Sequence, residues 1–99
     1  MSTPEYRTAY LEACLEEAPE DAAFIAKALG DLARAAGMSQ IASATGLSRE
    51  SLYKALSGGR TPSFATVLKV IHALGMRLHA TAYHDHQPKQ ADKTMSTRG

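Results

Sequence analysis

A short segment in the middle of the chain carries four polar side chains at the spacing of one helix face: Arg49, Glu50, Tyr53 and Lys54. Each suits the major groove of DNA. An arginine bonds bidentately to guanine, and a glutamate accepts a hydrogen bond from the cytosine amino group. Tyr53 offers its ring to a thymine methyl and its hydroxyl to a phosphate, while Lys54 suits a base or a phosphate. The alternative is a solvated helix face on which Glu50 and Lys54 form an i, i+4 pair and Tyr53 covers the core.

Small hydroxyl and amide side chains, together with one arginine, flank these four residues. Such groups suit phosphates, which position a protein on DNA without reading its sequence. The predicted contacts before the segment are Ser39, Gln40 and Ser48, and those near its end and after it are Ser57, Arg60 and Thr61. Ser48 is also the expected N-cap of the helix that begins at Arg49.

The apolar residues of the same region predict the helix pair that would position these side chains. Ala42 is small enough for a second helix to cross close above the first, and Gly46 supplies a left-handed turn four residues later. Leu47 would fill the corner, and Leu52 and Leu56 would form the inner face of the second helix. Residues 39–57 therefore read as a helix-turn-helix, whose second helix enters the major groove.

The flanking sequence predicts three more helices, so that the fold class is an all-α bundle of five. Capping residues, prolines and glycines place the helices at 4–18 after Thr3, at 19–36 before Gly37, at 40–45 after Ser39, at 49–57, and from 64 after Ser63 to Gly75. Gly30 lies inside the second of these. Its expected role is to let a neighbouring helix approach closely.

The periodicity changes from helical to alternating after the fifth helix. Met76, Leu78, Ala80 and Ala82 fall on one side of residues 76–83, which predicts a short C-terminal β-strand. One strand is not stable alone, and the simplest partner is the same strand of a second copy across a two-fold axis. The alternative is an extended end that packs on the bundle. Residues 84–99 read as a disordered tail, which leaves 1–83 as the domain.

Charge is distributed unevenly along the 99 residues, although the net charge is only +1. Residues 1–31 carry seven acidic and two basic side chains, whereas 32–83 carry six basic and one acidic. The basic segment coincides with the proposed DNA contacts and the acidic one suits a basic partner; the alternative is two ordinary solvated surfaces. No apolar run approaches the roughly 20 residues of a membrane span, and no signal-peptide core is present, so a cytoplasmic location is expected.

Catalytic and metal chemistry find little support, and we expect neither an enzyme nor a cofactor. Cys14 lies on an apolar stripe, where a thiol is usually structural rather than nucleophilic. His72 lies in the fifth helix, and His84, Asp85 and His86 make a poor metal site on a polar tail.

The stretch from about Tyr10 to Leu78 resembles the addiction-module antidote family, HigA-like antitoxins with an Xre/Cro-type helix-turn-helix. The matching segments are YLEACLEE at 10–17, FIAKALGDLARAAGMSQIA at 24–42, TGLSRESLYKALS at 45–57 and ATVLKVIHALGMRL at 65–78. Thr61 departs from the asparagine expected before the proline, which puts one loop contact in doubt. The resemblance implies a Cro/C1-repressor-like bundle that binds double-stranded operator DNA as a homodimer. It also implies an antitoxin that represses its own operon and neutralises a RelE/HigB-like ribonuclease toxin.

A toxin of that kind is basic, so the acidic first helix is the predicted toxin surface, through Tyr6, Tyr10, Glu12, Glu16 and Glu17. A solvated face above an apolar stripe is the alternative reading of this helix. Two other functions stay open: a stand-alone prophage-type regulator without a toxin partner, and a protein-binding module that does not bind DNA.

Overall fold

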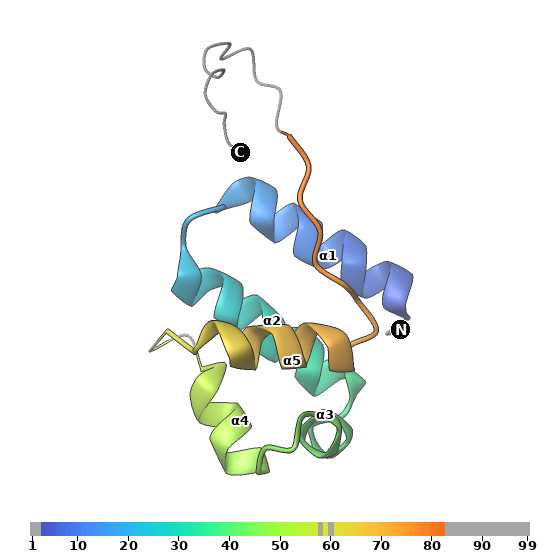
Figure 1. The fold of residues 1–99 in the computed structure, drawn as a ribbon, viewed down its shortest axis with the longest axis vertical. Helices are drawn as coiled ribbons and strands as arrows, with labels where there is room; N and C mark the ends of the chain where they lie inside the picture. The colour runs from blue at the N-terminus through green and yellow to red at the C-terminus, as the bar shows by residue number, and fades with distance from the viewer. Residues whose placement is uncertain (1–2, 58, 60, 83–99) are drawn as a thin grey trace, which may run out of the picture.

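The computed structural model describes residues 3–57, 59 and 61–82, which form five helices and no strand within these ranges (Figure 1). The helices are α1 (Pro4–Glu17), α2 (Ala22–Ala36), α3 (Met38–Thr45), α4 (Arg49–Ala55) and α5 (Phe64–Ala73). Helix α2 lies at the centre, where it packs against α1, α3 and α5, while α3 packs against both α4 and α5. The predicted all-helical class with five helices is confirmed.

Side-chain caps fix where most of the helices begin. Thr3 accepts a hydrogen bond from the Tyr6 N–H at 3.1 Å, and Ser48 and Ser63 cap α4 and α5 in the same way, all as predicted. The second helix begins later than predicted. Pro19 and Glu20 form a turn, and Asp21 is the N-cap, accepting from the Phe24 N–H at 3.0 Å.

The predicted start of the third helix at Ser39 is also wrong. Gly37 ends α2 and begins α3, because its φ of 112° turns the chain within a single residue. Ser39 therefore lies inside the first turn of α3 rather than capping it. The fourth helix ends at Ala55, two residues before the predicted Ser57, whose hydroxyl donates to the Lys54 carbonyl at 3.2 Å.

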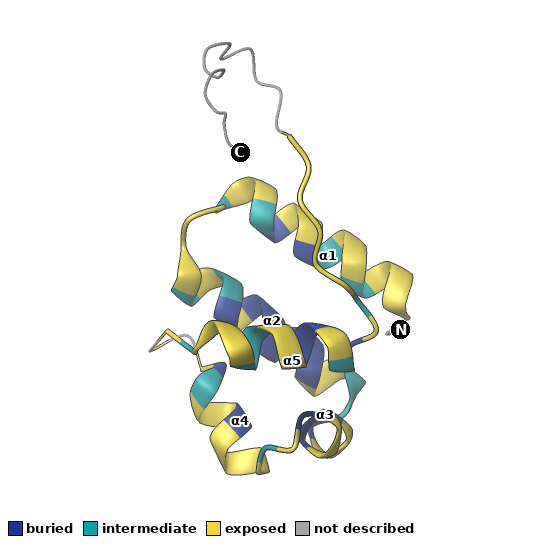
Figure 2. Ribbon diagram, in the orientation of Figure 1, coloured by how far each residue is buried: buried dark blue, intermediate teal, exposed yellow. Residues whose placement is uncertain are grey.

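The core is built from the inner faces of all five helices (Figure 2). The largest fully buried side chains are Leu29, Leu52, Leu56, Val70 and Leu74. Gly30 has the predicted role of a close approach, since a Cβ there would lie 2.7 Å from the Leu56 carbonyl oxygen. The Arg7 guanidinium donates to the Leu74 carbonyl, which ties α1 to the end of α5.

Residues 76–82 leave α5 and pass over α1 without forming a helix or a strand (Figure 1). The Met76 N–H donates to the Ile71 carbonyl at 3.0 Å, and its side chain packs against the core. Leu78, Ala80 and Ala82 are exposed. Strand pairing would need a second copy, so the predicted strand finds no partner within one chain and stays a prediction. Tyr83 and the predicted tail 84–99 lie outside the described residues.

None of the helices in the described part of the chain is long and apolar enough to cross a membrane.

Candidate nucleic-acid interface

The turn between α3 and α4 is held by backbone bonds that only a residue with positive φ permits. Gly46 has φ 78° and ψ 11°, and its N–H donates to the Ala42 carbonyl at 2.9 Å. The Leu47 N–H also donates to Ala42, at 3.2 Å. The buried Thr45 hydroxyl accepts from Leu47 and donates to Ala42, so its polar group is satisfied inside the corner. These bonds define the geometry of the turn, and the turn sets the direction of α4.

Helix α4 is anchored along one side only. Leu52 and Leu56, at its inner side and C-terminal end, are fully buried, and the Leu56 backbone lies directly against Gly30 of α2. Because side chains at i and i+4 share a face, the buried pair fixes which residues of α4 point outward.

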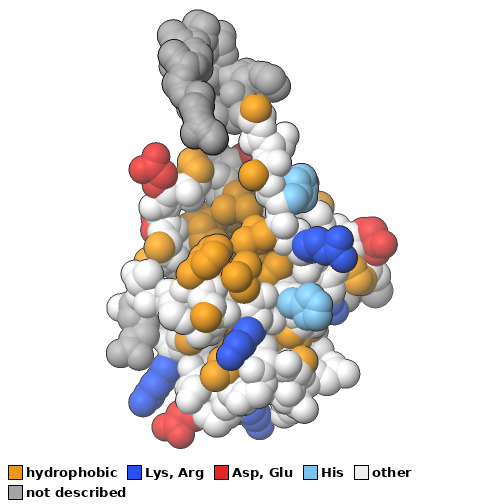
Figure 3. All heavy atoms as spheres, viewed as in Figure 1, with side chains coloured by type: hydrophobic (Ala, Val, Ile, Leu, Met, Phe, Trp, Pro, Cys, Tyr) orange, Lys and Arg blue, Asp and Glu red, His pale blue; other side chains and the backbone are white. Residues whose placement is uncertain are grey.

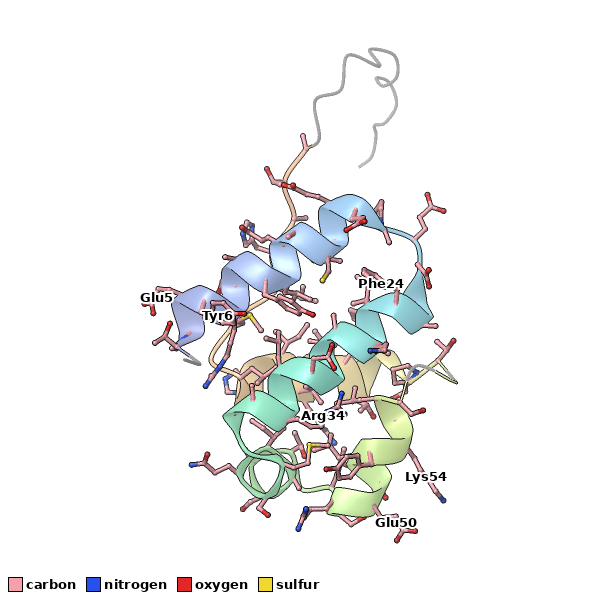
Figure 4. All side chains as sticks on the ribbon, turned by 180° about the vertical axis from the view of Figure 1, so that it is seen from behind. Glu5, Tyr6, Phe24, Arg34, Glu50 and Lys54 are labelled. Atoms are coloured by element: carbon pink, nitrogen blue, oxygen red, sulfur yellow. The ribbon has the colours of Figure 1, made fainter. Side chains whose placement is uncertain are left out.

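The outward face carries all four side chains that the sequence singled out: Arg49, Glu50, Tyr53 and Lys54 are exposed. Tyr53 is 42% exposed, so part of its surface is available on this face while the rest is covered by the bundle. Glu50 and Lys54 project from the same end of the molecule (Figure 4). The described residues form ion pairs at Asp31 but none between Glu50 and Lys54, so the helix-stabilising alternative has no support.

The predicted phosphate contacts fall into three groups. Ser39 and Gln40 are exposed in the first turn of α3. The Ser48 hydroxyl is engaged in capping α4, where it accepts from the Ser51 N–H at 3.0 Å. Ser57 and Thr61 are exposed beyond the end of α4, whereas Arg60 lies outside the described residues.

Two further hydroxyl residues, which the sequence reading did not assign to this surface, border it. Ser51, Lys54, Thr61 and Ser63 line a depression of about 410 Å³ between α4 and the start of α5. The N-terminus of α5 opens there, which favours an anionic group. Ser63 was recognisable only as a cap, because its proximity to Lys54 depends on how α5 packs.

The predicted toxin surface on α1 is divided. Tyr6 is exposed and its ring stacks on that of Tyr10 at 6.4 Å. Tyr10 itself is half-buried, and its hydroxyl donates to the Asp31 carboxylate of α2 at 3.4 Å. At about 100° per residue, Glu12 lies roughly 120° around the helix from Tyr6, whereas Glu17 lies near it. Glu12, Glu16 and Glu17 are all exposed, so the acids are available but Tyr10 is committed to the fold.

Two groups near the α1–α2 contact have shifted acidities. Burial and then the Asp31 carboxylate raise the pKa of Tyr10, and burial followed by Glu17 raises the pKa of the Cys14 thiol. A raised thiol pKa disfavours the nucleophilic thiolate. No cluster of three or more potential metal ligands occurs among the described residues, and His84, Asp85 and His86 lie outside them.

Comparison with known proteins identifies the family. Residues 1–82 match the model of the family described as "probable addiction module antidote protein". An uncharacterized protein of Haemophilus influenzae is 49% identical over 77 residues, which cover 78% of this chain and 77% of that protein. No solved structure matches this chain. Because the family match includes all of the described residues, the chain belongs to the family of probable addiction module antidote proteins.

Proposed function

We propose that this antidote protein is the antitoxin of a type II toxin–antitoxin module that binds operator DNA and represses its own operon. Its α3–α4 pair would act as a Cro-like helix-turn-helix, and its toxin partner would be a RelE/HigB-like ribonuclease. It would work in the cytoplasm, as a homodimer, by binding rather than by catalysis.

The observation that carries the proposal is that a helix anchored by the buried Leu52 and Leu56 exposes four polar side chains: Arg49, Glu50, Tyr53 and Lys54. A recognition helix needs this combination, because base edges are read only by side chains held in a fixed direction. The hydroxyl groups around α4 supply phosphate contacts on either side. The family supplies the toxin partner, and the exposed acids of α1 supply a surface for a basic one.

The test for DNA binding is a titration of the full chain with a duplex from upstream of its own gene and with a scrambled duplex of equal length. We expect the upstream duplex to bind at least about 10³-fold more tightly at physiological salt. Equal affinity for the two duplexes at the same salt concentration would refute the repressor.

The test for the toxin is co-expression with the short reading frame adjacent to the antidote gene. We expect that protein alone to stop growth, and the antidote to restore growth by forming a complex that survives size-exclusion chromatography. A neighbour that is harmless, or a toxin that stays active in the presence of the antidote, contradicts this half of the proposal.

A further inference from the structure

An uncovered apolar groove runs between α1 and α5, above the central helix α2 (Figure 3). Its larger part, about 390 Å³, is lined by Leu15 of α1, Ile25 and Leu29 of α2, and Val67 of α5. A smaller part of about 110 Å³ lies on the other side of Leu15, against residues 76–79. Helices α1 and α5 each bury one part of their apolar faces against neighbouring helices. The groove is the part of those faces that stays uncovered in a single chain.

Exposed apolar side chains stand beside the groove. Phe64 at the start of α5 is 67% exposed, and Leu68 one turn later is 41% exposed. Leu78, also 41% exposed, borders the smaller part. A monomer gains nothing by holding a ridge and a groove of this kind open to water. A two-fold interface presents the same patch on both subunits, so a ridge next to a groove is self-complementary.

The two ends of the groove differ in charge. Glu20 and Asp21 border the larger part, at the turn between α1 and α2. Arg77 and His79 border the smaller part, together with Glu12 of α1. A two-fold axis through the middle of the groove sets the first end of one copy opposite the second end of the other. Glu20 then faces Arg77 of the second copy.

We infer that a second copy of this chain docks on this face, with Phe64 and Leu68 of each copy seated in the groove of the other. The charges at the two ends favour this occupant, because a two-fold related copy brings Glu20 opposite Arg77 at both ends of the groove. This contact is an alternative to the pairing of residues 76–83 predicted from the sequence.

The same arrangement suits an operator with two half-sites. Helices α3 and α4 lie at one end of the long axis of the molecule, and the groove is on the side of it (Figure 1). A two-fold axis parallel to the long axis leaves both α4 helices at the same end, as a palindromic site requires. This orientation rests on the proposed function, whereas the contact itself does not.

The test is sedimentation of the full chain without DNA, comparing wild type, Phe64→Asp and Ala13→Asp. Phe64 is exposed and is the first residue of α5, where an acid is favourable, so Phe64→Asp keeps the fold. Ala13 provides the control: it is exposed and lies about 160° around α1 from Leu15. We expect Phe64→Asp to raise the dimer Kd at least about 30-fold. Ala13→Asp is expected to leave it unchanged.

A charge exchange tests the orientation. Glu20→Arg and Arg77→Glu are each expected to weaken the dimer about two- to fivefold, and the double variant to restore it. Asp21 is left unchanged because it caps α2.

Ala80→Pro separates this contact from strand pairing, because a proline removes a backbone donor from the ladder. We expect the dimer to persist in this variant. The inference is overturned if Ala80→Pro dissociates the dimer while Phe64→Asp does not. It is also overturned if wild type is monomeric at roughly 100 µM, where a dimer with a Kd near 1 µM is almost fully formed. A monomeric wild type is the result expected if the toxin, rather than a second copy of this chain, occupies the groove. Failure of DNA binding alone leaves these sedimentation results unaffected.

Discussion

Gly30 lets the backbone of α2 approach the C-terminal end of α4 closely. A Cβ at this position would lie 2.7 Å from the Leu56 carbonyl oxygen and 3.2 Å from the Leu56 Cβ. We expect Gly30→Ala to lower the free energy of unfolding by about 1–3 kcal/mol. Steric overlap with the backbone outweighs the roughly 1 kcal/mol that alanine gains in helix propensity. Urea denaturation measures the difference.

Gly59 provides the control, because the nearest atom to a Cβ there is the Ser57 hydroxyl at 3.7 Å. Gly59→Ala is expected to change stability by less than about 0.5 kcal/mol. A Gly30→Ala variant as stable as wild type would mean that the contact between α2 and the end of α4 is looser than described.

Tyr10 is expected to make the free energy of unfolding decrease as the pH rises into the alkaline range. Its pKa is raised by burial and by Asp31, so the folded state holds the phenolic proton more tightly than the unfolded chain. This contribution is fully present below about pH 10, the unfolded pKa, and is lost as pH rises through the higher folded value. We expect Tyr10→Phe to reduce the loss of stability between pH 9 and pH 11, roughly, in denaturant titrations.

Cys14 is also expected to contribute to the loss of stability at alkaline pH, since burial raises the pKa of its thiol. Cys14→Ala therefore serves as the comparison that isolates Tyr10. An alkaline loss of stability that is the same in Tyr10→Phe and wild type contradicts this role.

At the scale of the element, α1 belongs to the fold as well as to the proposed toxin surface. Leu11 and Cys14 are buried, and Arg7 bonds the end of α5. Deleting residues 1–18 would therefore damage the bundle itself. Charge reversal on the exposed side tests the toxin surface without that damage.

We expect Glu16→Lys combined with Glu17→Lys to weaken toxin binding roughly tenfold, because two attractive charges become repulsive. Calorimetric titration with the toxin measures the change. Operator affinity and the circular dichroism spectrum are the controls, and both should match wild type. Unaltered toxin affinity would place the toxin elsewhere.

The elements show how far the sequence predicts this fold. Local chemistry was sufficient for the Thr3, Ser48 and Ser63 caps and for the left-handed turn at Gly46, since each depends on a few neighbouring residues. The start of α3 was missed because Gly37 serves two helices at once, and a capping serine two residues later looks equally good in sequence.

In the candidate site, too, the features set by local sequence were predicted and those set by helix packing were not. The outward face of α4 follows from its buried leucines, so its four residues were found. The depression shared by Ser51, Lys54, Thr61 and Ser63 depends on how α5 packs beside α4, which no local pattern specifies.

At the scale of the whole molecule, the two proposed partner surfaces lie at opposite ends. Helix α1 with its exposed acids is at one end of the long axis, and α3 and α4 are at the other (Figure 1). Arg49 and Lys54, the two basic residues of α4, thus lie at the end opposite to the exposed acids of α1. Asp31 is excluded from the acidic face, because Lys27 and Arg34 pair with it at 3.9 Å and 2.6 Å.

This separation predicts that toxin and operator bind at the same time. In a gel-shift experiment, adding toxin to the antidote–operator complex should produce a slower band rather than free DNA. Release of the DNA by stoichiometric toxin would show that the two surfaces overlap or are coupled.

The most direct test of DNA reading by α4 compares wild type and Arg49→Ala on the operator and on a set of its single-base variants. Wild type should lose about 1–3 kcal/mol at one guanine position in each half-site, and Arg49→Ala should lose that preference while keeping the others. Lys54→Ala is the comparison if Lys54 contacts a phosphate: it should weaken all the duplexes alike and reduce the salt dependence. An Arg49→Ala protein that retains every base preference of wild type would contradict the assignment of α4 as the recognition helix.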